Sequence, residues 1–154
     1  MMKTHTIILG VIGSDCHAVG NAILERVFAE GGFQVVNLGT MVSQQEFIDA
    51  AIETDARAIL ISSLYGQGEL DCDGMRSRCI EMGLDDILLY VGGNLVIGKT
   101  DRTVIEEKYK GMGYDRVFTP DADLQEAVEL LKSDIIQHEH VRNTDKNEIK
   151  TRTA

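Results

Sequence analysis

The sequence contains one proline and no tryptophan, and aromatic residues make up only 5% of its 154 residues. So little proline argues against a chain made mainly of loops and linkers. No apolar run approaches the roughly 20 residues that a membrane-spanning helix needs, and the first residues show no signal-peptide pattern. The length suits a single domain with its own core. We therefore expect one folded domain in the cytoplasm.

Basic residues are also scarce, because 15 Lys and Arg are outnumbered by 25 Asp and Glu, for a formal net charge of -10. Nucleic acids are bound mainly through basic side chains, so they are not an expected partner. The cysteines, Cys16, Cys72 and Cys79, lack the paired spacing of a disulfide framework or a zinc site. We expect Cys72 and Cys79 to be partly buried free thiols.

Apolar segments typical of buried strands alternate with helical segments along most of the chain. This alternation predicts an α/β fold of the flavodoxin-like (Rossmann-like) type. We expect a five-stranded parallel sheet in the order 2-1-3-4-5 with helices on both faces. The strands are expected at residues 6–11, 34–38, 58–62, 87–91 and 116–118, and the helices at 18–30, 43–54, 71–82, 102–112 and 124–137.

Local signals support several of these helices. Ser43 followed by Glu46 predicts a capping box at the start of the second helix. In the first helix, Val19, Ile23 and Val27, with Leu24 beside them, are expected to face the sheet. Residues 1–137 should form the folded domain, and residues 138–154, which are polar and lack an apolar period, a flexible tail.

Polar and small residues follow three of the predicted strands. Asp15 and His17 come after the first strand, Ser62-Ser63 ends the third, and Gly92-Gly93 ends the fourth. In this sheet order the carboxyl ends of strands 1, 3 and 4 meet at the edge where ligands bind. Histidine is a common metal ligand and is usually oriented by a carboxylate. The pattern predicts a site for a large metal-bearing ligand, with His17 on the metal and Asp15 beside it.

Each segment taken alone also fits a simpler role. An Asp-x-His pair can be a local hydrogen bond or cap, and Gly-Gly after a strand can be only a turn. Other chemistries fit less well: residues 10–13 match neither the dinucleotide fingerprint nor the P-loop. A Ser/His/Asp hydrolase is also disfavoured, because the G-x-S-x-G nucleophile elbow is missing.

Taken together, the three segments resemble the D-x-H-x-x-G … S-x-L … GG signature of cobalamin-binding domains, in order and in separation. The matching residues are Asp15, His17, Gly20, Ser62, Leu64, Gly92 and Gly93. A closer resemblance, over about residues 5–137, is to the small (sigma) subunits of glutamate mutases. It is carried by the segments 11–21, 62–69, 89–94 and 111–117.

This resemblance implies that cobalamin binds with its own dimethylbenzimidazole base displaced and His17 as the lower cobalt ligand. It places the nucleotide tail beside Gly92-Gly93, with Ser62 near the benzimidazole nitrogen. The cofactor-contacting residues it implies are Ser14, Asp15, Cys16, His17, Ala18, Gly20, Ser62, Ser63, Leu64, Gly92, Gly93, Asn94, Leu95, Val96, Ile97 and Gly98.

The implied activity is the adenosylcobalamin-dependent isomerisation of L-glutamate to L-threo-3-methylaspartate, a radical rearrangement in glutamate metabolism. The resemblance also implies that the substrate site lies on a larger epsilon subunit, so this chain itself holds no catalytic residue. The expected assembly is a heterotetramer of two small and two large subunits. The alternatives are a cobalamin-binding subunit of another mutase, of the methylmalonyl-CoA mutase type, or a corrinoid methyl carrier.

Overall fold

The computed structural model describes residues 4–13, 19–63, 68–93, 102–119 and 122–152. The chain divides into two compact units, Met1–Ala122 and Asp123–Ala154. In the described ranges, no helix combines the length and apolar character that crossing a bilayer requires.

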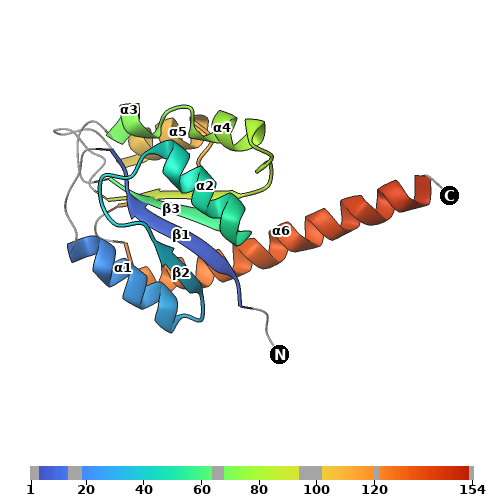
Figure 1. Ribbon diagram of the computed structural model, residues 1–154, viewed down its shortest axis with the longest axis horizontal. Coiled ribbons are helices and arrows are strands. Elements are labelled where there is room, and N and C mark those ends of the chain that lie inside the picture. Colours follow the sequence, from blue (N-terminus) through green and yellow to red (C-terminus); the bar gives the residue numbers. More distant parts are fainter. Residues whose placement is uncertain (1–3, 14–18, 64–67, 94–101, 120–121, 153–154) are drawn as a thin grey trace. The chain divides into compact units, whose positions relative to one another are not determined.

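The first unit contains a five-stranded parallel sheet in the order β2-β1-β3-β4-β5, which confirms the predicted fold class and strand order (Figure 1). Strands β1, β3 and β4 are almost completely buried, as expected for a parallel sheet covered on both faces. The strands are β1 (Thr6–Val11), β2 (Gln34–Asn37), β3 (Ala58–Ser62), β4 (Leu88–Gly92) and β5 (Arg116–Phe118).

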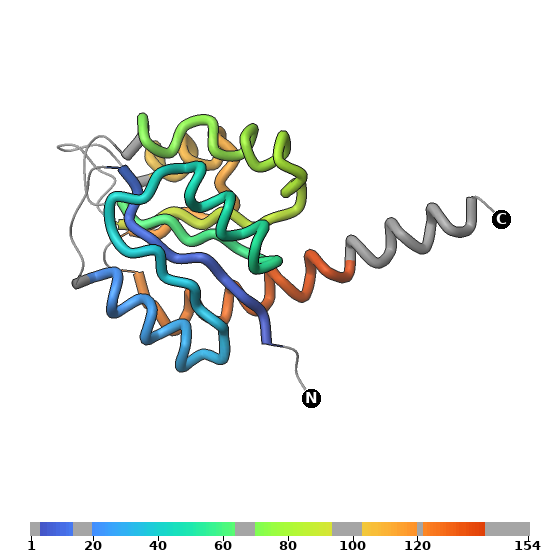
Figure 2. Tube along the Cα trace, in the orientation of Figure 1, coloured from blue at the N-terminus to red at the C-terminus, as the bar shows by residue number. Residues whose placement is uncertain are grey.

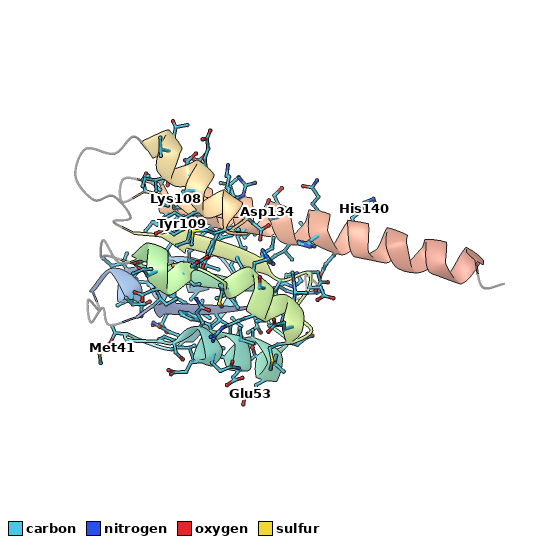
Figure 3. All side chains as sticks on the ribbon, turned by 90° about the horizontal axis from the view of Figure 1, so that it is seen from above. Met41, Glu53, Lys108, Tyr109, Asp134 and His140 are labelled. Atoms are coloured by element: carbon cyan, nitrogen blue, oxygen red, sulfur yellow. The ribbon has the colours of Figure 1, made fainter. Side chains whose placement is uncertain are left out.

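Helices cover the two faces unequally. Helix α1 (Val19–Glu30) lies on one face of the sheet, and the other helices of this unit lie on the opposite face (Figures 1 and 2). The second group packs into the main core through Phe47, Met75 and Tyr109, and Figure 3 shows Tyr109 turned inward beneath its helix. These helices are α2 (Gln44–Thr54), α3 (Gly68–Cys72), α4 (Met75–Glu81) and α5 (Arg102–Gly111).

The prediction that Ile23 faces the sheet from α1 is wrong. Ile23 is 51% exposed, whereas Asn21 is 4% and Phe28 2% exposed. Residues 21, 24 and 28 share one face of a helix, and residue 23 lies two positions, about 200°, round the helix from Asn21. The apolar character of Ile23 was therefore a misleading guide, because the inward position is occupied by a polar amide.

The predicted capping box of α2 is confirmed. The Ser43 hydroxyl accepts a hydrogen bond from the Glu46 amide at 3.2 Å, and the Glu46 carboxylate accepts one from the Ser43 amide at 3.3 Å. The single helix predicted over 71–82 is wrong, because α3 ends at Cys72 and α4 begins at Met75. Gly74 between them has φ +80°, a left-handed conformation that interrupts a helix and that glycine adopts readily.

The second unit is a single helix, α6 (Leu124–Arg152). Asp123 caps its start, since its carboxylate accepts hydrogen bonds from the amides of Gln125 (2.9 Å) and Glu126 (3.4 Å). The predicted end near residue 137 is wrong: residues 138–152 contain neither glycine nor proline, so nothing in them stops the helix. The division into a domain and a tail stays a prediction. The buried side chains of α6 include Ala127, Val128, Leu131 and Ile135.

Arg76 ties α4 to the amino ends of β4 and β5. Its guanidinium donates to the carbonyl oxygens of Gly113 (3.0 Å) and Ile87 (2.7 Å) and to the Asp115 carboxylate (2.7 Å). The same Asp115 oxygen accepts a hydrogen bond from the Leu89 amide at 2.8 Å. The Arg76 side chain thus supplies hydrogen-bond donors to two backbone carbonyls. It also holds the Asp115 carboxylate, which binds the backbone of β4 at Leu89.

We expect Arg76→Met to lower the free energy of unfolding by about 2–3 kcal/mol, because three acceptors lose a charged donor. Urea denaturation of the purified chain measures this loss. Arg78→Met, an exposed arginine of the same helix, is the matched control and should change stability by less than about 0.5 kcal/mol. Equal losses in the two variants would contradict this role of Arg76.

Candidate functional site

The carboxyl ends of β1, β3 and β4 meet at one edge of the sheet, as predicted. The register pairs Val11 with Ser62 and Ser62 with Gly92. The Ile12 amide donates to the Ser62 carbonyl at 3.0 Å, and the Ser63 amide donates to the Gly92 carbonyl at 2.9 Å. The end of β3 is therefore held between its two neighbours by backbone hydrogen bonds.

The structure describes only part of the predicted site. Ser62 and Ser63 are 7% and 2% exposed, and both lie at this edge together with Gly92 and Gly93. Gly20, in the first turn of α1, is exposed and has open space beside its Cα. The predicted residues that lie outside the described ranges are Ser14, Asp15, Cys16, His17, Ala18, Leu64, Asn94, Leu95, Val96, Ile97 and Gly98.

Gly93 is required by the backbone itself. Its φ is +109°, and a Cβ atom at this position would overlap the carbonyl oxygen of Ser63. Only glycine tolerates both this conformation and this approach. A Cβ on Gly92 would make only an ordinary contact, at 3.4 Å from the Cβ of Phe118. The two glycines therefore have different roles. Gly93 allows the ends of β3 and β4 to approach closely, because it has no Cβ atom to overlap Ser63.

A second close approach lies at the end of β1. Gly13 has φ +76°, and a Cβ there would overlap the carboxylate of Asp71, which comes from α3. The Gly13 amide donates to the Val42 carbonyl at 3.0 Å. Asp71 is thus a carboxylate at the site edge that the sequence analysis did not single out, because it placed residue 71 only as the start of a helix.

The loop between β2 and α2 reaches the same end of the sheet. Met41 in this loop has φ +56°, an uncommon conformation for a side chain of its size. It is 61% exposed, and Figure 3 shows its side chain pointing away from the fold. The strained, exposed methionine contributes nothing to the core.

A partly buried polar network joins α1 to the end of β2. The Asn21 side-chain amide donates to Asn37 Oδ1 at 2.7 Å, and the same oxygen accepts the Gly39 amide at 2.9 Å. Asn37 in turn donates to the Glu25 carboxylate at 2.9 Å. The Asn21 carbonyl oxygen is buried, and no donor in the described part of the chain reaches it.

The sequence analysis missed this network. A signal was available, because Asn21, Leu24 and Phe28 recur with helical spacing and place an amide on an otherwise apolar stripe. The polar residue at the end of β2, Asn37, is the matching signal on the sheet. Phe28, a large apolar residue, marks the helix face on which Asn21 lies.

The buried side chains of Cys72, Cys79 and Tyr114 are unreactive at neutral pH. Cys72 and Cys79 are free, as predicted, and burial raises the pKa of the Cys72 thiol to about 12 and that of Cys79 to about 11. Burial also raises the pKa of Tyr114 far above its usual range, and its hydroxyl donates to the Cys72 carbonyl at 2.8 Å. At neutral pH the two thiols stay protonated, so neither is a nucleophile or a thiolate ligand.

Within the described ranges, no three His, Cys, Asp or Glu side chains gather as a metal site would require. What the described edge offers is hydroxyl groups, tightly fitted backbone and a buried polar layer under α1.

A scan of family models matches residues 5–129 to the B12 binding domain. Two curated relatives are each named glutamate mutase sigma subunit. The protein of Yersinia enterocolitica serotype O:8 is 63% identical over 134 residues, which cover 87% of this chain and 90% of the relative. That of Escherichia coli O157:H7 is 61% identical over 140 residues, which cover 91% and 94%.

Among solved structures, this chain resembles a cobalamin-binding protein from Desulfitobacterium hafniense with a TM-score of 0.70 at 18% sequence identity. The match covers 86% of this chain and only 60% of that protein. At this identity the likeness shows the fold alone, and it agrees with the observed strand order.

We expect Gly93→Ala to destabilise the chain by about 3 kcal/mol or more, because it adds a backbone overlap to the strain of a positive φ. Gly83→Ala is the matched control: Gly83 has φ +85°, but a Cβ there meets nothing within 4 Å. Its cost should be about 1 kcal/mol, from conformation alone. Urea denaturation compares the two, and similar losses would contradict the close approach of Gly93 to Ser63.

Proposed function

This chain belongs to the B12 binding domain family and, within it, to the glutamate mutase sigma subunits, and on that premise we propose that it binds cobalamin at the carboxyl edge of its sheet. The observation that carries the proposal is the identity of 61–63% to named sigma subunits over about nine-tenths of this chain. The matched region includes all three signature segments and the whole of the sheet.

The described residues fit such a ligand. On the α1 side of the sheet, Ser62 offers a hydroxyl and Gly92 lacks a side chain at the level where the strands end. Asn21 keeps a buried acceptor without a donor among the described residues. Buried polar groups are rarely left unpaired in native proteins, so this acceptor supports a ligand that brings an O–H or N–H group.

We assign His17 as the lower cobalt ligand and Asp15 as the carboxylate that orients its imidazole. Ser62 lies near the nucleotide tail in this proposal, with Gly92-Gly93 beside it. The role of these residues is to hold and orient the cofactor. When bound, adenosylcobalamin supplies the radical chemistry through its weak cobalt–carbon bond. Further contacts are proposed from Ser14, Cys16, Ala18, Gly20, Ser63, Leu64, Asn94, Leu95, Val96, Ile97 and Gly98.

The proposed reaction is the isomerisation of L-glutamate to L-threo-3-methylaspartate, with a larger subunit holding the substrate. A barrel able to enclose that substrate takes about 250 residues, more than this chain of 154 contains. The name sigma subunit, shared by the relatives, supports a complex with a catalytic partner. A heterotetramer of two small and two large subunits in the cytoplasm stays a prediction.

Reconstitution tests the activity. The chain is mixed with a glutamate mutase large subunit, adenosylcobalamin and L-glutamate, and methylaspartate is measured. We expect product only when all four components are present. His17→Ala should lower the rate by at least about a hundredfold, because losing even an outer-shell partner of a metal ligand costs about 10- to 100-fold. Binding of cobalamin without any methylaspartate would contradict the mutase assignment and leave cobalamin binding intact.

Electron spin resonance of the Co(II) form tests the assignment of His17 directly. One nitrogen-14 ligand splits the cobalt lines into triplets, and protein labelled with nitrogen-15 histidine should give doublets instead. His17→Ala should abolish this sensitivity to the isotope. His5→Gln is the control, because His5 precedes β1 at the opposite end of that strand. A spectrum that labelling leaves unchanged would show that no histidine of this chain binds the cobalt.

A further inference from the structure

The carbonyl oxygen of the Asn21 side chain is a buried acceptor that the fold does not use. Asn21 is 4% exposed, and its Oδ1 has no donor within the described ranges. Leaving an amide oxygen dry and unpaired destabilises the folded chain. An apolar residue at this position of the inward stripe would avoid that cost, so the amide points to a partner beyond the described residues.

Its orientation follows from the network around it. The Asn37 oxygen accepts the Gly39 amide at 2.9 Å, so Asn37 presents its acceptor, and Asn21 must use its amide nitrogen to reach it at 2.7 Å. The Asn21 oxygen is therefore turned away from Asn37. Because Asn37 keeps the Gly39 amide as a donor, the network does not need Asn21 in order to be satisfied.

The sheet register places this acceptor in one layer with Ser62. Asn37 pairs with Leu9, and its side chain reaches α1, so Leu9 also faces α1. Side chains alternate along a strand, so Val11, two residues after Leu9, also faces α1. Ser62 is paired with Val11 in the neighbouring strand and therefore faces α1 too. Asn21 and Ser62 thus both belong to the layer between α1 and the carboxyl end of the sheet.

We propose that Asn21 Oδ1 accepts a hydrogen bond from a ribose hydroxyl in the nucleotide tail of bound cobalamin. This inference rests on the proposed function, which brings the tail beside Ser62 and Gly92. The benzimidazole nitrogen and the phosphate of the tail are acceptors, so its ribose supplies the O–H donors. Asn21 is then a binding residue that recognises the tail and has no part in holding the cobalt.

The test compares Asn21→Leu with wild type in the affinity for cobalamin and for cobinamide, which lacks the ribose, its phosphate and the base. Absorbance titration of the purified apo chain measures both. We expect Asn21→Leu to weaken cobalamin binding about tenfold, the value of one hydrogen bond of about 1.4 kcal/mol. Cobinamide binding should change less than about twofold. The urea midpoint of the apo chain should not fall, because the leucine removes an unpaired acceptor.

Glu25→Ala is the control, because it removes the exposed end of the same network and leaves the Asn21 oxygen in place. It should leave both affinities within about twofold of wild type. If leucine does not fit, Asn21→Ala removes the same acceptor and gives the same comparison. Unchanged cobalamin affinity, or equal losses for cobalamin and cobinamide, would overturn the assignment of Asn21. A wild-type chain that binds neither ligand would instead overturn the proposed function.

Discussion

Backbone hydrogen bonds between parallel strands align the described part of the candidate site. The ladder sets Val11, Ser62 and Gly92 side by side and continues beyond the strands through the amides of Ile12 and Ser63. Because the backbone makes this alignment, loops from distant parts of the sequence open at one edge whatever their side chains are. The edge can therefore carry residues chosen for a ligand, while the strands behind it keep their packing.

The two faces of the sheet differ in the residues that they bury near the carboxyl ends of the strands. On the face of α2, α4 and α5, large apolar side chains such as Phe47, Met75 and Tyr109 are fully enclosed. Under α1, at the carboxyl end of the sheet, the layer contains the amides of Asn21 and Asn37 and approaches Ser62. Polar groups in such a layer are costly unless they are paired, so the layer favours a bound ligand over an empty site.

We propose that cofactor, larger subunit and this chain each perform a different part of the reaction. In that proposal cobalamin would supply the radical chemistry and a larger subunit would enclose the substrate, which would leave this chain to hold the corrinoid. The described side chains suit that role, because the thiols of Cys72 and Cys79 are protonated at neutral pH and the Tyr114 hydroxyl is engaged with the backbone.

By itself, the sequence determined the fold class and the capping box of α2, because apolar periodicity and short-range hydrogen bonds are local properties. The strand order, and with it the edge where β1, β3 and β4 end together, followed from the connection rules of parallel α/β sheets. Tertiary structure alone decided that Asn21 and not Ile23 faces inward, that Gly93 must accommodate the Ser63 carbonyl, and that Asp71 approaches Gly13. These features depend on how close two segments come after folding. A distance between residues that are far apart in the chain leaves no periodic trace in the order of amino acids.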